Sequence, residues 1–351
     1  MQICIYAPTN DGIGNIIRDI SKMLSKHNID NYVYELINGE DKLLKMLSPR
    51  TLAILHNPYP PNMLIRLAQI ITCPKVFLYH NTTPSFFFEG HEPEIKTLQD
   101  VQLSEISKVS PYFRYAWGVS EYNCSQLEQV GFLKTAAANP PFDFNRYEDI
   151  APSNEIEKDD NKTSIIFVGR VTYNKRLEDI IKAFYYYYKI NPNSILTLIG
   201  PLVHDNYNKI LLNLVSELNI PVQFTGMIPT GELVAYYKNA DLFLCMSEHE
   251  GFCIPIIEAM HFGIPVIAFS STAVLETVTN AGILFSQKHF PSVAHLMNEV
   301  MSNNSLREKM ISAGKERAQY YNEENSSKRF MKLINDYANE LGFIEVMMKH
   351  E

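Results

Sequence analysis

The sequence has 351 residues, of which 46% are hydrophobic and 11% aromatic, and its formal net charge is −8. This length suits two domains of ordinary size, and the apolar and aromatic content excludes a disordered chain. The acidic balance argues against nucleic-acid binding through bulk charge, so we expect no nucleic-acid partner.

The cysteines and the apolar runs indicate the compartment. Five cysteines occur without a C-x-x-C pair or a spacing typical of metal ligands, and most lie in apolar runs. They indicate reduced thiols in the core of a cytoplasmic protein. No apolar run approaches the length of about 18 residues that spans a membrane, and the first residues lack the features of a signal peptide.

Short apolar runs alternate with stretches long enough for helices through most of the chain. Continuous apolar strands of this kind are typical of parallel sheets covered by helices on both faces. The alternation lapses at residues 145–164, an acidic and polar segment that we interpret as a linker. We therefore expect two doubly wound domains, 1–150 and 151–324, with a helix at about 325–351 that packs back on the first.

A glycine-containing segment, APTNDGIGN, follows the first predicted strand. Gly12 and Gly14 are expected between that strand and a helix, where glycine lets a ligand approach the backbone. The third position of a dinucleotide fingerprint is filled by Ile17, and no Gly-Lys-Ser/Thr follows, so neither that fingerprint nor a Walker loop is present. By itself the segment suits a tight turn at least as well.

His80 ends the predicted strand PKVFLYH and precedes Asn81 and a polar loop. A histidine in this position can donate to a sugar hydroxyl or accept a proton. Lone histidines are more often structural, and His56 ends another predicted strand without other support. His80 is thus a candidate for catalysis, with a purely structural role as the alternative.

Three cations follow the predicted strand SIIFV, namely Arg170, Lys175 and Arg176. Ligands of doubly wound sheets bind beyond the carboxyl ends of the strands. Cations placed there suit a diphosphate, because arginine forks onto two oxygens and lysine supplies a compact charge. A solvated basic loop is the alternative.

The stretch SEHEGFCIPIIEAMHFGIPVIA places Glu250 and Glu258 around a predicted strand-to-helix turn. The free N–H groups of Gly251, Phe252 and Cys253, with the helix dipole behind them, predict a site for an anion such as a diphosphate. A carboxylate accepts in pairs, which suits the hydroxyls of a ribose or a sugar ring. Charges that merely stabilise the helix start are an equally good interpretation of the spacing alone.

The spacing of Glu250 and Glu258 resembles the E-x7-E motif of the retaining GT-B glycosyltransferases, in particular family 4. The order of the other segments, among them FTGMIPTGELVAYYKNADLFLCMSEHEGF, also resembles that family over essentially the whole chain. The resemblance implies an α/β GT-B fold, with two Rossmann-like doubly wound parallel-sheet domains facing a cleft. Cys253 departs from the family, in which many members carry glycine at this place.

The same resemblance implies roles for the candidate residues. Glu250 would contact the transferred sugar, Glu258 the ribose, and Arg170 and Lys175 the diphosphate. The amides of residues 251–253 and the glycines at 12 and 14 would assist with the phosphates, and the histidine at 80 would lie beside the donor sugar and the acceptor. The sequence contains neither a D-x-D nor an H-E-x-x-H motif, so we expect no bound metal.

The implied activity is the transfer of a sugar from a UDP- or GDP-linked donor to a saccharide or lipid-linked hydroxyl, in cell-surface polysaccharide assembly and with no cofactor. Between Lys42 and Phe88 the chain has five Lys/Arg and no Asp/Glu, which suits a lipid-linked acceptor and peripheral contact with the inner face of the membrane. A buried helix with parallel strands explains that stretch more readily. Rival functions are a GT-B epimerase, a phosphorylase and a non-catalytic sugar-nucleotide-binding protein.

Overall fold

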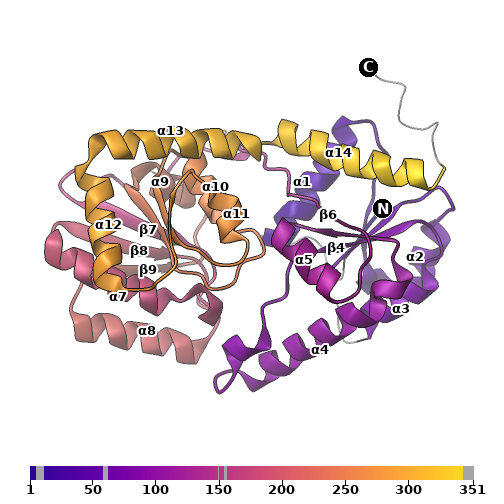
Figure 1. Cartoon of the computed structure of the whole chain (residues 1–351), viewed down its shortest axis with the longest axis horizontal. Coiled ribbons are helices and arrows are strands. Elements are labelled where there is room, and N and C mark those ends of the chain that lie inside the picture. Colours follow the sequence, from indigo (N-terminus) through magenta and orange to yellow (C-terminus); the bar gives the residue numbers. More distant parts are fainter. Residues whose placement is uncertain (5–11, 58–61, 149, 154–155, 343–351) are drawn as a thin grey trace. The chain divides into compact units, whose positions relative to one another are not determined.

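The structure, a computed structural model, describes residues 1–4, 12–57, 62–148, 150–153 and 156–342. It divides into two compact units, one formed by Met1–Asp143 with Tyr321–Glu351 and the other by Phe144–Tyr320 (Figure 1). The boundaries fall at residues 143 and 320, where the sequence placed them at 150 and 324. Each unit is built around its own parallel sheet.

The first unit contains a six-stranded parallel sheet in the order β2-β1-β3-β4-β5-β6. Its central strands β3 and β4 are apolar and almost wholly buried, as expected of strands covered by helices on both faces. The strands are β1 (Gln2–Cys4), β2 (Val33–Glu35), β3 (Ala53–His56), β4 (Lys75–Tyr79), β5 (Tyr115–Gly118) and β6 (Thr135–Ala137). The helices before residue 144 are α1 (Gly12–Lys26), α2 (Glu40–Met46), α3 (Met63–Ile70), α4 (Pro93–Val109) and α5 (Glu121–Gln129).

The helix α14 (Glu323–Glu340) belongs to the first unit although it follows the second in sequence. Phe330 packs edge-on against Trp117 of β5, and the hydroxyl of Tyr337 donates to the carbonyl of Lys75 over 3.1 Å. Glu340 at the end of the helix accepts from Tyr115, and its pKa falls to about 2 because Lys134, Tyr115 and Arg114 all hydrogen-bond to the carboxylate. These contacts fix the returning helix on the sheet.

The second unit contains a six-stranded parallel sheet in the order β12-β11-β10-β7-β8-β9. The strands are β7 (Thr163–Val168), β8 (Ser194–Ile199), β9 (Val222–Gly226), β10 (Leu242–Cys245), β11 (Val266–Phe269) and β12 (Ile283–Phe285). The helices are α6 (Asn145–Glu148), α7 (Leu177–Ile190), α8 (Asp205–Leu218), α9 (Thr230–Asn239), α10 (Ile254–His261), α11 (Val274–Val278), α12 (Phe290–Ser302) and α13 (Asn304–Tyr320). The prediction of two doubly wound parallel sheets is confirmed.

The order of the strands fixes where a ligand belongs in the second unit. The chain runs outward from β7 to β9, then returns to the other side of β7 and runs outward again from β10 to β12. The direction of winding therefore reverses between the neighbouring strands β7 and β10. In open α/β sheets ligands bind at this switch point, outside the carboxyl ends of the strands.

The segment interpreted as a linker is not wholly a linker. Its first residues form α6, and Tyr147 within them is buried. Phe144, just before α6, stacks on His261 with ring centroids 4.1 Å apart. The prediction was wrong for these residues because composition averages over 20 positions and hides one anchoring aromatic side chain.

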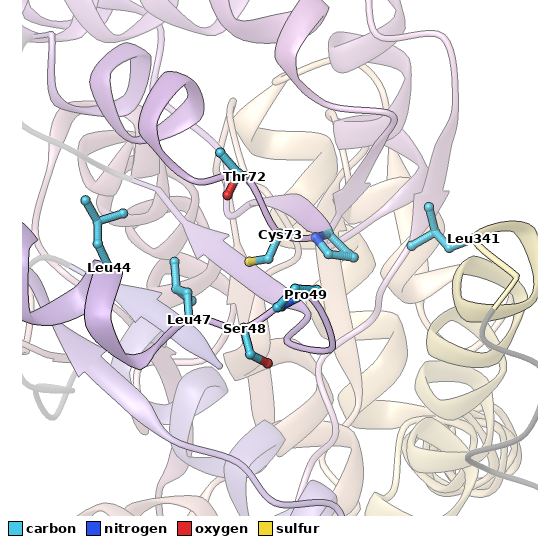
Figure 2. Close-up of a pocket in the computed structure, with 8 residues that line it drawn as sticks. Leu44, Leu47, Ser48, Pro49, Thr72, Cys73 and Leu341 are labelled. Atoms are coloured by element: carbon cyan, nitrogen blue, oxygen red, sulfur yellow. The ribbon is translucent and has the colours of Figure 1, made fainter.

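The first unit has a cavity of about 360 Å³. It lies at the edge of the sheet where the strands begin, opposite to their carboxyl ends. Figure 2 shows the lining side chains, which come from the segments that precede β3 and β4 and from the residue after α14. Because ligands of doubly wound sheets bind at the carboxyl ends, this cavity is not the expected donor site.

None of the helices in the described ranges combines the length and apolar character needed to cross a membrane.

Candidate functional site

A buried ion pair lies at the switch point of the second unit. Lys175, at the end of a short 3₁₀ turn after β7 (η4, Tyr173–Lys175), places its Nζ 2.5 Å from Oε2 of Glu250, which follows β10. The side chains are only 16% and 8% exposed. Removing two charges from water is costly, and this pair lies at the edge of the sheet where ligands of open α/β sheets bind.

Backbone contacts hold the two loops of the ion pair together. The amide of Glu248 donates to the carbonyl of Asn174 over 2.8 Å, and the side chain of Asn174 donates to the carbonyl of His249 over 2.9 Å. The amide of Glu250 donates to Oγ1 of Thr272, beyond β11, over 2.9 Å. Three neighbouring strands thus position one carboxylate, which is a rigid arrangement.

The helix α10 begins at Ile254, after a short turn that follows Glu250. Cys253 is its N-cap residue in a left-handed conformation with φ of 73°, and no side chain caps the helix. Gly251 lies in the turn, and the carbonyl of Phe252 accepts a hydrogen bond from Thr277, which fixes the turn's shape. The first amides of α10 and its dipole favour an anion at this place.

Glu258 lies inside α10 and is buried between two tyrosines. Its Oε1 accepts from the hydroxyl of Tyr147, and its Oε2 accepts from the hydroxyl of Tyr237 over 2.8 Å. Burial and the carboxylate raise the pKa of both tyrosines, so both remain donors. Each carboxylate oxygen has a second lone pair that a ligand hydroxyl can use. Sequence reasoning missed both tyrosines, since neither has a distinctive spacing from Glu258.

The three cations that follow β7 differ in their surroundings. Arg176 contacts Glu178 at 3.0 Å, Asp179 at 3.2 Å and Glu248 at 3.5 Å, so three carboxylates surround its guanidinium. Arg170 is exposed just after β7. Carboxylates thus surround Arg176, and a role of this residue toward a diphosphate stays a prediction.

The glycines of the first unit differ from the prediction. Gly12 and Gly14 were expected in a loop, but α1 begins at Gly12 and Gly14 lies buried in its first turn. The helix α1 therefore begins two to three residues earlier than expected from the positions of the glycines. Residues 5–11, which include the first part of APTNDGIGN, lie outside the described residues.

His80 is paired with His56 inside the first unit. The Nε2 of His80 lies 2.8 Å from Nδ1 of His56, and the rings stack with centroids 5.1 Å apart. The amide of His80 donates to the side chain of Asn57. No other feature of the sequence supports a role for His56, but His56 ends β3 opposite Leu78, and His80 directly follows the neighbouring parallel strand β4. The pairing gives His80 a partner within the first unit, and its role toward a ligand stays a prediction.

This pair predicts a pH dependence of stability. The pKa of His56 lies well below its ordinary value, because burial disfavours the imidazolium and His80 adds a like charge. The unfolded chain binds a proton at His56 below about pH 6.5 and the native ring does not, so stability falls by up to about 1.4 kcal/mol per pH unit below that point. Urea unfolding at pH 7.5 and pH 5.5 should show this loss in wild type and a smaller one in His56→Leu.

The exposed His27 of the same unit provides the control. His27→Gln should retain the full loss of unfolding free energy between the two pH values. An equal loss in wild type and His56→Leu would contradict the assignment of the effect to the buried pair.

The sequence of the second unit is similar to those of known glycosyltransferases. Residues 150–317, nearly all of the second unit, match the family model for glycosyl transferases group 1. An uncharacterised glycosyltransferase of Methanocaldococcus jannaschii is 31% identical over 44% of this chain and 40% of its own. The capsular polysaccharide biosynthesis glycosyltransferase CapM of Staphylococcus aureus is 26% identical over 44% of this chain and 40% of its own. The chain thus spans about two-fifths of the length of these curated relatives.

Two solved structures share the fold over nearly the whole chain. A sucrose-phosphate synthase of Thermosynechococcus elongatus superposes with a TM-score of 0.76 at 18% identity, covering 97% of this chain and 98% of its own. HepE of Anabaena, in complex with UDP and glucose, superposes with a TM-score of 0.75 at 17% identity, covering 95% and 98%. The fold is therefore GT-B.

Proposed function

We propose that this chain is a glycosyltransferase that uses a nucleotide-diphosphate sugar, and that the donor binds at the carboxyl edge of the second unit. The observation that carries the proposal is the buried pair of Lys175 and Glu250 at the switch point, beside the start of α10. The pair falls inside the region that matches glycosyl transferases group 1. The start of α10, which favours an anion, and the carboxylate of Glu250, which can accept from hydroxyl groups, then lie at the same edge of the sheet.

The proposed donor lies along α10. Its diphosphate takes the first amides of the helix, with Lys175 and the exposed Arg170 as cations. Its ribose hydroxyls donate to Glu258, whose orientation Tyr147 and Tyr237 fix from the other side. The sugar reaches Glu250. For the first unit, roles for His80, Gly12 and Gly14 stay predictions.

The proposed chemistry follows from these groups. The bond from the anomeric carbon to the diphosphate oxygen breaks, which leaves negative charge on the diphosphate and positive charge on the sugar. The ammonium of Lys175 and the helix amides stabilise the charge that develops on the leaving group, and one such donor contributes about 3 kcal/mol. Glu250 orients the sugar while the acceptor oxygen forms the new bond and loses its proton. We further propose retention of the anomeric configuration, as in the enzymes that this motif resembles.

The donor and acceptor classes follow from the relatives. UDP is the first candidate nucleotide because HepE binds UDP in the same fold, and GDP is the second. A saccharide or lipid-linked acceptor in polysaccharide assembly is proposed because CapM is named for capsular polysaccharide biosynthesis. The first unit would bind this acceptor, in the cytoplasm or in peripheral contact with the membrane.

Calorimetric titration tests nucleotide binding directly. UDP or GDP should bind the purified chain, and a chelator should not change the affinity, because amides, lysine and arginine replace a magnesium ion at the diphosphate. UMP should bind more weakly than UDP, since it lacks the second phosphate. Loss of all diphosphate binding in the presence of chelator would contradict the metal-independent site.

A further inference from the structure

Two thiols lie against the carboxylate of the proposed site. Cys245 is the last residue of β10 and Cys253 caps α10, and both are free and buried. Their sulfur atoms and a carboxylate oxygen of Glu250 all lie within 4.8 Å of one another. The Sγ of Cys245 also lies 3.3 Å from Oγ of Ser247. Within the described residues this is the one cluster of three side chains with the spacing of metal ligands.

The cluster is suited to a particular class of metal. Thiolates prefer zinc, cadmium and related thiophilic ions, whereas magnesium prefers oxygen ligands. Ligands of a tetrahedral zinc ion lie about 2.0–2.3 Å from the metal, so atoms within 4.8 Å of one another reach it after shifts of about 1 Å. We propose that Cys245, Cys253 and Glu250 form a binding site for one zinc-class divalent cation, with a water as the fourth ligand.

The charge balance makes such a site tolerable although it is buried. In the metal-free protein the Glu250 carboxylate and the Lys175 ammonium cancel, and a protonated thiol adds no charge. Binding a divalent cation releases the two thiol protons, so two positive charges from the metal meet two new negative charges on sulfur. The net charge of the buried group is unchanged, and the large cost of burying an unpaired charge does not arise.

The consequence for activity rests on the proposed function. A metal on Glu250 competes with Lys175 for the carboxylate and occupies the place proposed for the donor sugar. Zinc should therefore inhibit transfer, and the nucleotide sugar should compete with it. Magnesium should not inhibit. Cys253 makes the proposed site sensitive to zinc. The turn before α10 carries a thiol at this position, where a glycine would offer no side-chain ligand.

Titration of the full-length reduced protein with Cd²⁺ tests the site without any assay of activity. The thiolate-to-cadmium absorption in the ultraviolet should saturate at one cadmium ion with two thiolate ligands. Cys253→Ser should lower the affinity for Cd²⁺ at least tenfold and remove half of the absorption. Cys124→Ser changes a buried cysteine of α5 in the first unit and should alter neither quantity.

Two further measurements keep the proposal open to contradiction. Cys245 is fully buried, so Cys245→Ser is compared only if its melting temperature matches that of wild type, and Cys245→Ala replaces it otherwise. Glu250→Gln should retain the two-thiolate absorption with a weaker affinity. Equal Cd²⁺ binding in wild type and Cys253→Ser, or none in wild type, overturns the metal site. Normal Cd²⁺ binding without any sugar-transfer activity would contradict the proposed function alone.

Discussion

Replacing Glu250 with glutamine or Lys175 with methionine is expected to lower sugar transfer by about a hundredfold to a thousandfold. Loss of one preorganised charged group at a site where charge develops costs about 2.7–4 kcal/mol of barrier, which corresponds to this range. Both groups lie in the loops that follow β7 and β10, so the two variants should still form the sheet. Steady-state kinetics with saturating donor would measure the loss.

The ion pair allows the chemistry to be separated from stability. Lys175→Met leaves the Glu250 carboxylate buried without its cation, which should cost about 3–5 kcal/mol of unfolding free energy. Lys175→Met combined with Glu250→Gln removes both charges, so it should be more stable than Lys175→Met alone and still inactive. Lys209→Met, on the surface of α8, is the matched control and should keep full activity. Full activity of Glu250→Gln would return Glu250 to a merely structural charge at the helix start.

Replacing Glu258 with glutamine is expected to weaken binding of the nucleotide diphosphate by about tenfold to 150-fold. A hydrogen bond to a charged group contributes about 1.5–3 kcal/mol, and the amide removes the charge that the ribose hydroxyls would meet. The same change also leaves one of the two tyrosine hydroxyls facing an NH₂ donor. Calorimetric titration with the bare nucleotide would measure the affinity without contributions from the sugar.

The tyrosines distinguish contact from positioning in this prediction. Tyr237→Phe keeps the carboxylate and removes one hydroxyl that orients it, so nucleotide binding should weaken less than in Glu258→Gln. If the lost contact is with the ribose, Glu258→Gln should lower the affinities for UMP and UDP by equal factors. The second phosphate of UDP should therefore not restore binding. A larger loss for UDP than for UMP would place Glu258 at the diphosphate instead.

The fold was predictable because the central strands of the two sheets, such as β3, β4 and β10, are buried on both faces and therefore appear as short apolar runs. The site was predictable in part because a strand followed by a helix start is a local feature. Glu250, Glu258 and Lys175 all lie on such features, and the first and last of these form an ion pair. Their roles toward a ligand stay predictions.

The rest depends on contacts between segments that are distant in sequence. Tyr147 reaches Glu258 across 111 positions, and His56 reaches His80 across 24, so no local pattern reveals either pairing. The partner of Lys175 is similarly nonlocal, because Glu250 lies 75 positions further along the chain. Strand order supplies the missing information. It brings β7 beside β10 and β3 beside β4.

One measurement tests the central claim most directly, namely cleavage of a panel of UDP- and GDP-linked sugars by the purified chain, without added acceptor and with chelator present. We predict slow release of nucleotide diphosphate and free sugar from one donor, and near-complete loss of that release in Glu250→Gln. Binding of a nucleotide without consumption of any donor, even after saccharide and lipid-linked acceptors are added, would contradict the assignment of glycosyltransferase activity. Equal cleavage by wild type and Glu250→Gln would contradict the assignment of the site.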